Sequence, residues 1–333
     1  MSKPLIAVTM GDPAGVGPEV CLQLLANEVV PDFARVVVFG DAGVLSNCAR
    51  QVGLPEPACV IPEGGWDEVC ATLDEPAVLD IPGFDKTDFL PGIVSARTGA
   101  AGYRYVMKSI EIALAGQISG VATAPLNKEA LRAAGILYPG HTEIFSDKTG
   151  AKRSCMFQYS EEVRASFVTV HVGYGEVPAL LTVERILDVI ELTAEAMQRI
   201  RGTIPKIAVL GLNPHAGEHG LFGNGEEEKI IIPAIEAARS RGFIIEGPLP
   251  PDTAFIPAKR HSTDAFICMY HDQGHIPLKA LAFDTAVNTT LGLPIIRTSV
   301  DHGTACDIAW QRKAKGSSLV EAVRLAAKMC RTS

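Results

Sequence analysis

The sequence lacks a cysteine framework, a long apolar run and a basic tract, and each absence excludes a class of protein. Its eight cysteines include no C-x-x-C pair and have no regular spacing, which argues against a disulfide scaffold. No run approaches 18 apolar residues, so we expect no membrane span. The first apolar stretch, in MSKPLIAVTMGDP, is too short for a signal peptide. We therefore expect a reduced, soluble, cytoplasmic protein.

The charge balance also restricts the partners. The net charge is −8, and without a basic tract nucleic acid is not an expected partner. An anionic substrate would instead need a local cluster of cations. The 333 residues, of which 47% are apolar and 20% charged, are sufficient for two domains or one large α/β domain. All eight histidines lie between His141 and His302, so any histidine chemistry is assembled by the second part of the chain.

Short apolar runs alternate with amphipathic stretches, a pattern typical of an α/β fold with a largely parallel sheet. The expected strands cover residues 5–10, 35–39, 120–124, 166–170, 206–210 and 265–270. The expected helices include residues 98–115, 182–200, 225–241 and 319–330. We predict two lobes, the first formed by 1–124 and 286–333 and the second by 125–285.

Three histidines follow expected strands at the edge where open α/β sheets bind ligands: His171, His215 and His271. A lone histidine there is more often structural, but three imidazoles can hold Zn²⁺, Co²⁺ or a similar ion. Glu218 and Asp272 could orient two of the rings. The spacing alone leaves open whether the three converge.

Two cations and an amide lie in what looks like one loop-rich region. Lys279 and Arg297 flank Asn288, and a guanidinium fork matches a phosphate or carboxylate. The alternative is a pair of solvated surface charges. The apolar neighbours of Arg297, residues 293–296, favour the first interpretation.

Two turns could receive a cofactor. Gly11–Glu19 follows the first strand with the spacing G-x-x-x-G-x-G, which differs from the dinucleotide fingerprint G-x-G-x-x-G. It can be an anion-binding helix start or a plain βα turn. In the second turn Gly303 permits close backbone approach, His302 could stack on an adenine and Asp307 could bind ribose. Alternatively, Thr304 caps a helix.

Seven segments in order, spanning nearly the whole chain, resemble the 4-hydroxythreonine-4-phosphate dehydrogenase family: VTMGDPAGVGPE, TAPLNKE, YPGHTE, GLNPHAGE, GPLPPDT, YHDQG and NTTLGLPIIRTSVDHGTA. The resemblance implies a two-lobed α/β/α fold like that of the isocitrate and isopropylmalate dehydrogenases. It implies a homodimer with its active site in the interlobe cleft at the subunit interface. It also implies NAD and one divalent metal cation (Zn, Co or Mg).

The resemblance further assigns roles by motif. The implied metal ligands are His171, His215 and His271, the third coming from the partner subunit. The implied substrate contacts are His141, Thr142, Lys279, Asn288 and Arg297. The implied catalytic residues are Lys279, Asp252 and His141. The implied cofactor contacts are Gly292, Pro294, His302, Gly303, Thr304, Ala305 and Asp307.

The implied reaction is oxidation of a C3 hydroxyl followed by loss of CO₂ from the β-keto acid. His275–Lys279, Phe283 and the tail Asp307–Trp310 resemble the branch that oxidises 4-phospho-D-threonate or 4-phospho-D-erythronate. The vitamin B6 branch, which oxidises 4-phosphohydroxy-L-threonine for pyridoxal phosphate synthesis, usually lacks His275. The sequence is also compatible with a dihydrodiol dehydrogenase of aromatic dicarboxylate breakdown and with a non-catalytic sensor of metal and sugar phosphate. Retention of APLNKE, GHTE and Arg297 favours a phosphorylated substrate.

Overall fold

The computed structural model describes residues 3–84, 89–283 and 285–330 and divides into two compact units. Unit 1 comprises Met1–Ala151 and Leu293–Cys330, and unit 2 comprises Lys152–Gly292. Both are α/β, as predicted, but the unit boundaries differ from the predicted lobes. Helices α5 (Lys128–Ala133) and α6 (His141–Thr149) belong to unit 1 because they pack on α4 (Ala96–Leu114). The last three residues of the predicted first lobe, 331–333, lie outside the described residues.

The sheet of unit 1 has the strand order β3-β4-β2-β1-β5-β12, and each neighbouring pair in this order is parallel. The strands are β1 (Leu5–Thr9), β2 (Arg35–Gly40), β3 (Val60–Pro62), β4 (Ala77–Asp80), β5 (Gly120–Thr123) and β12 (Arg297–Val300). Strand β1 is buried along its whole length. Such a strand reads as a continuous apolar run rather than an alternating one, because helices cover both faces of the sheet.

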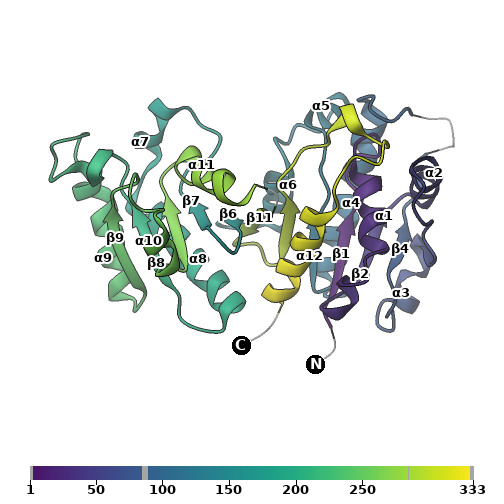
Figure 1. Ribbon diagram of the computed structural model, residues 1–333, viewed down its shortest axis with the longest axis horizontal. Helices are drawn as coiled ribbons and strands as arrows, with labels where there is room; N and C mark the ends of the chain where they lie inside the picture. The colour runs from purple at the N-terminus through teal and green to yellow at the C-terminus, as the bar shows by residue number, and fades with distance from the viewer. Residues whose placement is uncertain (1–2, 85–88, 284, 331–333) are drawn as a thin grey trace. The chain divides into compact units, whose positions relative to one another are not determined.

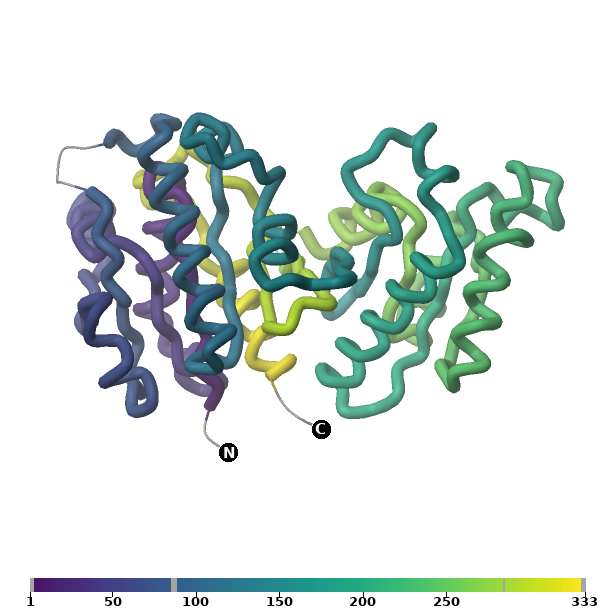
Figure 2. Tube along the Cα trace, turned by 180° about the vertical axis from the view of Figure 1, so that it is seen from behind, coloured from purple at the N-terminus to yellow at the C-terminus, as the bar shows by residue number. Residues whose placement is uncertain are grey.

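Helices α1 (Gly17–Leu25) and α12 (Ser317–Met329) lie on one face of the unit 1 sheet, and α4 lies on the other (Figures 1 and 2). The remaining helices are α2 (Ala42–Val52) and the short α3 (Trp66–Val69). The chain returns from unit 2 to unit 1 through β12, which pairs with β5, and α12 packs on both strands. The C-terminal segment is thereby placed beside the N-terminal strands.

The sheet of unit 2 has the order β11-β6-β7-β10-β8-β9. Its strands are β6 (Cys155–Tyr159), β7 (Arg164–Phe167), β8 (Lys206–Leu210), β9 (Ile244–Leu249), β10 (Ala265–Cys268) and β11 (Val287–Leu291). Strand β6 runs antiparallel to both of its neighbours, whereas the other pairs are parallel, as a largely parallel sheet predicts. Helices α8 (Val183–Arg201) and α9 (Ile232–Ser240) cover one face, and α11 (His271–Ala282) lies against the other (Figures 1 and 2). The short helices are α7 (Val177–Leu180) and α10 (Pro257–His261).

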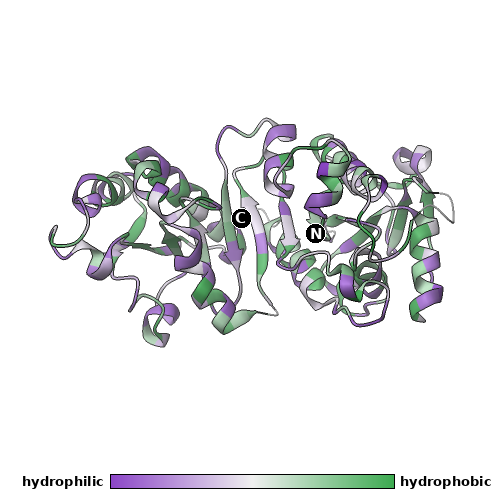
Figure 3. Ribbon diagram, turned by 90° about the horizontal axis from the view of Figure 1, so that it is seen from above, coloured by the Kyte–Doolittle hydropathy of each residue, from purple (hydrophilic) through white to green (hydrophobic). Residues whose placement is uncertain are grey.

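The core of each unit lies between its sheet and its helices. In unit 2 the central cluster joins Phe167 on β7, Leu210 on β8 and Phe266 on β10. Figure 3 shows green, hydrophobic strands inside each unit and purple, hydrophilic stretches on the surrounding helices. Within the described ranges, no helix combines the length and apolar character needed to cross a bilayer.

Candidate active site

In unit 1 the glycine turn is joined by hydrogen bonds to the segment after β12, which includes the loop at 302–307. The backbone N–H of Val16 donates to the Thr304 carbonyl at 2.9 Å, and the Trp310 indole N–H donates to the Pro13 carbonyl at 3.3 Å. A Cβ added at Gly15 would lie 2.8 Å from the Thr304 carbonyl oxygen, so only glycine allows this approach. The turn is therefore not a plain βα connection, because it also carries the loop at 302–307.

Two polar residues outside the predicted set of site residues stabilise this arrangement, Asn127 at the loop and Asp12 at the glycine turn. Asn127 caps α5 by accepting the N–H of Ala130 at 2.9 Å, and its amide also contacts the Thr304 hydroxyl at 3.5 Å. Asp12 is 1% exposed and accepts the N–H of Ala14. Burial raises the pKa of Asp12, an effect that this hydrogen bond and one from Thr98 oppose. The interpretation of Thr304 as a helix cap is wrong, since Ala305 occupies the cap position of the following 3₁₀ turn.

The side chain of Arg297, at the start of β12, is buried rather than exposed to solvent. The residue is 2% exposed, and its guanidinium donates to the Thr123 hydroxyl at 2.9 Å and lies 5.5 Å from the centre of the Phe145 ring. Burial lowers the pKa of Arg297 to about 9, although the Glu143 carboxylate opposes the shift. We expect the guanidinium to stay protonated at neutral pH. A desolvated cation of this kind attracts an anion strongly.

His141 is the first residue of α6 and lies near Arg297 in the same unit. Among the described residues its buried Nε2 has no hydrogen-bond partner. Such an atom carries a desolvation cost unless a ligand satisfies it. Burial lowers the pKa of His141 well below its ordinary value of 6.5, and the positive charge of Arg297 lowers it further. The ring is therefore neutral at physiological pH and can accept a hydrogen bond or a proton at Nε2.

This lowered pKa predicts a pH dependence of stability. As the pH falls, His141 takes up a proton in the unfolded chain before it does so in the folded protein. The contribution of neutral His141 to the free energy of unfolding is therefore complete above the ordinary pKa and is lost as the pH falls below that value. The slope is at most about 1.4 kcal/mol per pH unit. Replacing His141 with glutamine should therefore reduce the drop in Tm between about pH 7.5 and about pH 5.5. The exposed His261 supplies the matched His261→Gln control, which should keep the wild-type drop. Equal drops in wild type and His141→Gln would contradict the assignment.

In unit 2 the three predicted histidines follow three neighbouring parallel strands. Cys268 of β10 is in register with Phe167 of β7, and Ile267 of β10 with Val209 of β8, so the strands end at a common edge. His171 and His215 have φ of 48° and 54°, in the left-handed region that bulky residues rarely adopt. Strained backbone of this kind persists where the surroundings enforce it and is frequent at functional sites.

His171 and His271 line the same cavity. Their ring centres are 5.7 Å apart, and both belong to a pocket of about 250 Å³ that also includes Tyr174 and Asp272. As predicted, Asp272 orients a ring: its carboxylate contacts Nδ1 of His271 at 2.7 Å. The Tyr174 hydroxyl donates to the same carboxylate, and this bond, followed by the one with His271, holds the pKa of Asp272 below its usual range. With Nδ1 engaged, Nε2 of His271 is the nitrogen left for a ligand.

His275 has a role that the sequence did not reveal. It is 6% exposed, and its ring stacks with those of His271 and Phe167, whose centres lie 3.8 Å and 4.5 Å away, respectively. Its Nδ1 contacts the His271 carbonyl at 3.0 Å and its Nε2 contacts the Gln158 amide at 3.2 Å. The residue interpreted as a branch marker is thus a buried support for the His271 ring.

His215 is not among the residues that line the cavity of the other two histidines. Its exposed ring contacts Phe222, with 6.2 Å between ring centres. In the part of the chain that the structure describes, no three His, Cys, Asp or Glu residues are close enough to hold a metal ion. Nor does any hydrogen bond of the described residues join the Glu218 carboxylate to the His215 ring. The predicted orienting role of Glu218 is therefore not observed.

The remaining predicted residues are divided between the units. In unit 2, Lys279 is exposed on α11 with its Nζ 5.6 Å from the centre of the Phe283 ring, Asp252 is exposed after β9, and Asn288 lies on β11 opposite Gln158. The buried Oδ1 of Asn288 has no partner among the described residues. The region that looked loop-rich is thus a helix and two strands.

The predicted cofactor contacts are also divided. Unit 1 holds Pro294 and the loop from His302 to Asp307, and it also holds Thr142, a predicted substrate contact that follows His141 on α6. Gly292 belongs to unit 2, where a Cβ would meet the Arg153 carbonyl oxygen at 2.3 Å.

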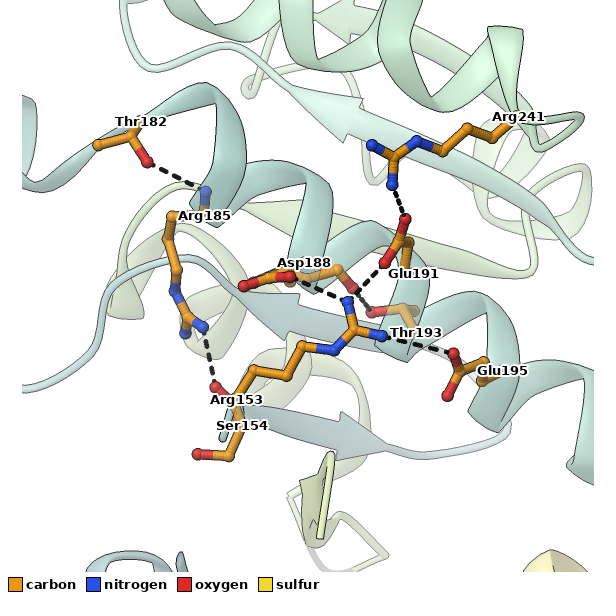
Figure 4. A network of polar contacts seen from close by, with 10 residues as sticks. Arg153, Ser154, Thr182, Arg185, Asp188, Glu191, Thr193, Glu195 and Arg241 are labelled. Atoms are coloured by element: carbon orange, nitrogen blue, oxygen red, sulfur yellow. Dashed lines mark hydrogen bonds and ion pairs between the residues drawn. The ribbon is translucent and has the colours of Figure 1, made fainter. Parts of the chain in front are cut away.

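Arg185 on α8 supports the segment that leads to His171. Its guanidinium donates to the Val168 carbonyl at 3.1 Å and to the Ser154 carbonyl at 2.9 Å, the latter bond being drawn in Figure 4. On the same helix, Asp188 and Glu191 bind Arg153 (Figure 4). Pairs of this kind are partly exposed and contribute little each, so the Arg185 contacts to backbone matter more for the position of His171.

Comparisons with known proteins fit this arrangement. The family model "Pyridoxal phosphate biosynthetic protein PdxA" matches residues 32–326. A 4-hydroxythreonine-4-phosphate dehydrogenase from Desulforapulum autotrophicum is 43% identical over 330 residues, covering 98% of this chain and 95% of the relative. A D-threonate 4-phosphate dehydrogenase from Pectobacterium atrosepticum is 44% identical over 335 residues, covering 99% and 100%. The crystal structure of a 4-hydroxythreonine-4-phosphate dehydrogenase from Klebsiella pneumoniae has a TM-score of 0.88 and 41% identity, covering 99% of each chain.

The fold and these relatives define the class of the protein as an α/β dehydrogenase. The chain belongs to the PdxA family, and the resemblance drawn from the sequence motifs is confirmed.

Proposed function

We propose that this protein is an NAD-dependent and divalent-metal-dependent dehydrogenase that oxidises the C3 hydroxyl of 4-phospho-D-threonate or 4-phospho-D-erythronate, after which the β-keto acid loses CO₂. The observation that carries the proposal is the presence in unit 1 of the buried Arg297 and of a His141 Nε2 that has no hydrogen-bond partner among the described residues. Together they offer a cation and a neutral acceptor to an anionic hydroxy acid.

Support for a divalent cation comes from the chemistry of the side chains rather than from an assembled set of three ligands among the described residues. Imidazole suits Zn²⁺ and Co²⁺, His171 and His271 line one cavity, and Asp272 leaves Nε2 of His271 available. We propose that His215 is the third ligand beside His171 and His271. We also propose that the chain forms a homodimer, in which a second copy of the chain supplies one of the three imidazoles at each site. When bound, the cation would act as a Lewis acid toward the oxygen on C3.

The residues of this chain bind and orient the substrate. Arg297 and Lys279 hold the phosphate, with Thr142 and Asn288 as further contacts, so that remote binding energy orients the reacting carbon. The proton of the C3 hydroxyl passes to a base, for which the neutral Nε2 of His141 is our first choice, with Lys279 and Asp252 as the others. When bound, NAD would supply the acceptor for the hydride, the hydrogen of C3 with its two bonding electrons. Cleavage of the bond to the carboxylate then releases CO₂, and its electron pair passes to the new ketone.

The loop at 302–307 is proposed to receive NAD. Support comes from its anchoring on the glycine turn through Val16 and from the exposed side chains of His302 and Asp307. These two can stack on an adenine and accept ribose hydroxyls, respectively. The helix start at Gly17 adds a backbone N–H group near the turn, whereas Pro18 has none.

A second candidate substrate is 4-phosphohydroxy-L-threonine, because relatives named for it are as similar to this chain as those named for D-threonate 4-phosphate. Purified protein would be given each of the three phosphorylated compounds with NAD and with or without a chelator, and NADH absorbance would be followed. We expect turnover of the sugar acids and its loss on metal removal. Turnover of the amino acid alone would instead favour pyridoxal phosphate synthesis.

Three further outcomes would change the proposal more deeply. Reduction of NAD with a non-phosphorylated dihydrodiol alone would favour aromatic dicarboxylate breakdown. Absence of turnover with every compound, in protein shown to bind metal and substrate, would favour a non-catalytic sensor. Undiminished rates after verified metal removal would contradict the metal mechanism with any substrate.

A further inference from the structure

The loop that carries His215 has an unusual backbone. Here the His215 loop means residues 211–223, between β8 and the π-helical turn Glu227–Ile231. Six consecutive residues, 215–220, have positive φ, and only two of them are glycines. L-residues normally visit this region singly, because Cβ crowds the following carbonyl. The loop must therefore be held by contacts from outside its own backbone.

Glu227 supplies these contacts. One carboxylate oxygen, Oε1, accepts the backbone N–H groups of Leu212 and Asn213, both at 2.8 Å. The other, Oε2, accepts the side-chain amide of Asn213 at 2.9 Å. Glu227 is 1% exposed. A buried carboxylate requires hydrogen-bond partners, and the partners described for Glu227 all belong to the His215 loop.

Neighbouring residues fit closely around this carboxylate. A Cβ added at Gly217, whose φ is 78°, would lie 2.7 Å from Glu227 Oε2. Glu226, which is 7% exposed, accepts the Asn213 amide at 3.0 Å and the Asn224 N–H at 2.8 Å. The loop is thus wrapped around a fixed anion at the start of a helical segment.

We propose that Glu227 is the positioning residue for His215, fixing the left-handed turn so that the imidazole is presented in one orientation. This rests on the proposed function, in which His215 is a metal ligand. Glu227 does not touch the metal or the substrate in this account. It acts because the anchor points, Leu212 and Asn213, lie directly before the turn that carries the ring.

The test compares Glu227→Ala and Glu227→Gln with Glu228→Ala, an exposed neighbour that serves as the matched control. Co²⁺ binding to metal-stripped full-length protein would be measured by titration calorimetry, and amide hydrogen exchange would be followed at Leu212 and Asn213. We expect Glu227→Ala to weaken Co²⁺ binding by about 10- to 100-fold and to speed exchange at both amides. Glu227→Gln keeps one acceptor oxygen but places a second NH₂ group against the Asn213 amide. We therefore expect a smaller loss of Co²⁺ affinity than in Glu227→Ala. Glu228→Ala should behave as wild type.

Unchanged Co²⁺ affinity in folded Glu227→Ala would overturn the inference, even if its Tm fell, because a merely structural role lowers Tm without changing affinity. Should the alanine variant not fold, the glutamine variant decides by the same two readouts. His215→Ala tests the metal role of His215 separately from the positioning role of Glu227, and this variant should lose Co²⁺ binding. If it binds as wild type does, the metal role of His215 fails and the inference fails with it. If it loses binding while the Glu227 variants do not, only the positioning role fails.

Discussion

Replacing His271 with alanine should lower kcat/KM by at least about 10³-fold, equivalent to about 4 kcal/mol of transition-state stabilisation. The ring is part of the cavity that His171 also lines, and it is held on one side by Asp272 and on the other by the stacked His275. The substitution deletes one of the proposed imidazole ligands, and Asp272 and His275 then have no ring to orient. Steady-state kinetics with the phosphorylated sugar acid and measurement of bound metal would check both parts.

The exposed His261 on α10 provides the control, because His261→Ala removes an imidazole from the same unit without touching the cavity. It should keep wild-type kinetics and metal content. A fully active His271→Ala protein that also retains its metal would show that the ion is held elsewhere.

Arg297→Met should lower kcat/KM for the phosphorylated substrate by about 10²- to 10³-fold, or about 3–4 kcal/mol, most of it through KM. Methionine keeps much of the length and apolar contact with Phe145, so the lost feature is the cation. In wild type that cation is buried beside the neutral Thr123 hydroxyl, where an anionic group gains strongly from it.

The decisive measurement is the ratio of kcat/KM between the phosphorylated acid and the same acid without phosphate. Arg297→Met should reduce this ratio, whereas Arg132→Met, which changes an exposed arginine on α5 of the same unit, should not. If Arg297→Met impairs both substrates equally, the guanidinium supports the fold or the reacting carbon rather than the phosphate.

Much of the fold was predictable because local patterns decide it. Strand β8 matches the expected range, and α4 and α8 begin and end within two residues of the predicted limits. The apolar runs specify buried strands, and their alternation with helices specifies a parallel sheet. A parallel sheet then brings the strand ends together, which is why His171 and His271 could be expected at one edge.

Contacts between distant segments were not predictable in this way. Helices α5 and α6 follow the strand at which we placed the lobe boundary, and only their packing on α4 assigns them to unit 1. His275 gives no sequence signal for its stacking on His271 and Phe167. Glu218 was the nearer carboxylate in sequence to His215, yet Glu227 is the one that the π-helical turn brings beneath the loop.

The sequence by itself determined the α/β class, the strand-end histidines and the family motifs, because periodicity and short motifs are local properties of the chain. The tertiary structure decided which polar groups are buried and what they contact. Burial makes Arg297 a desolvated cation, keeps His141 neutral and ties Glu227 to the His215 loop. These properties depend on which surfaces exclude water, and that is settled only when segments far apart in the chain pack together.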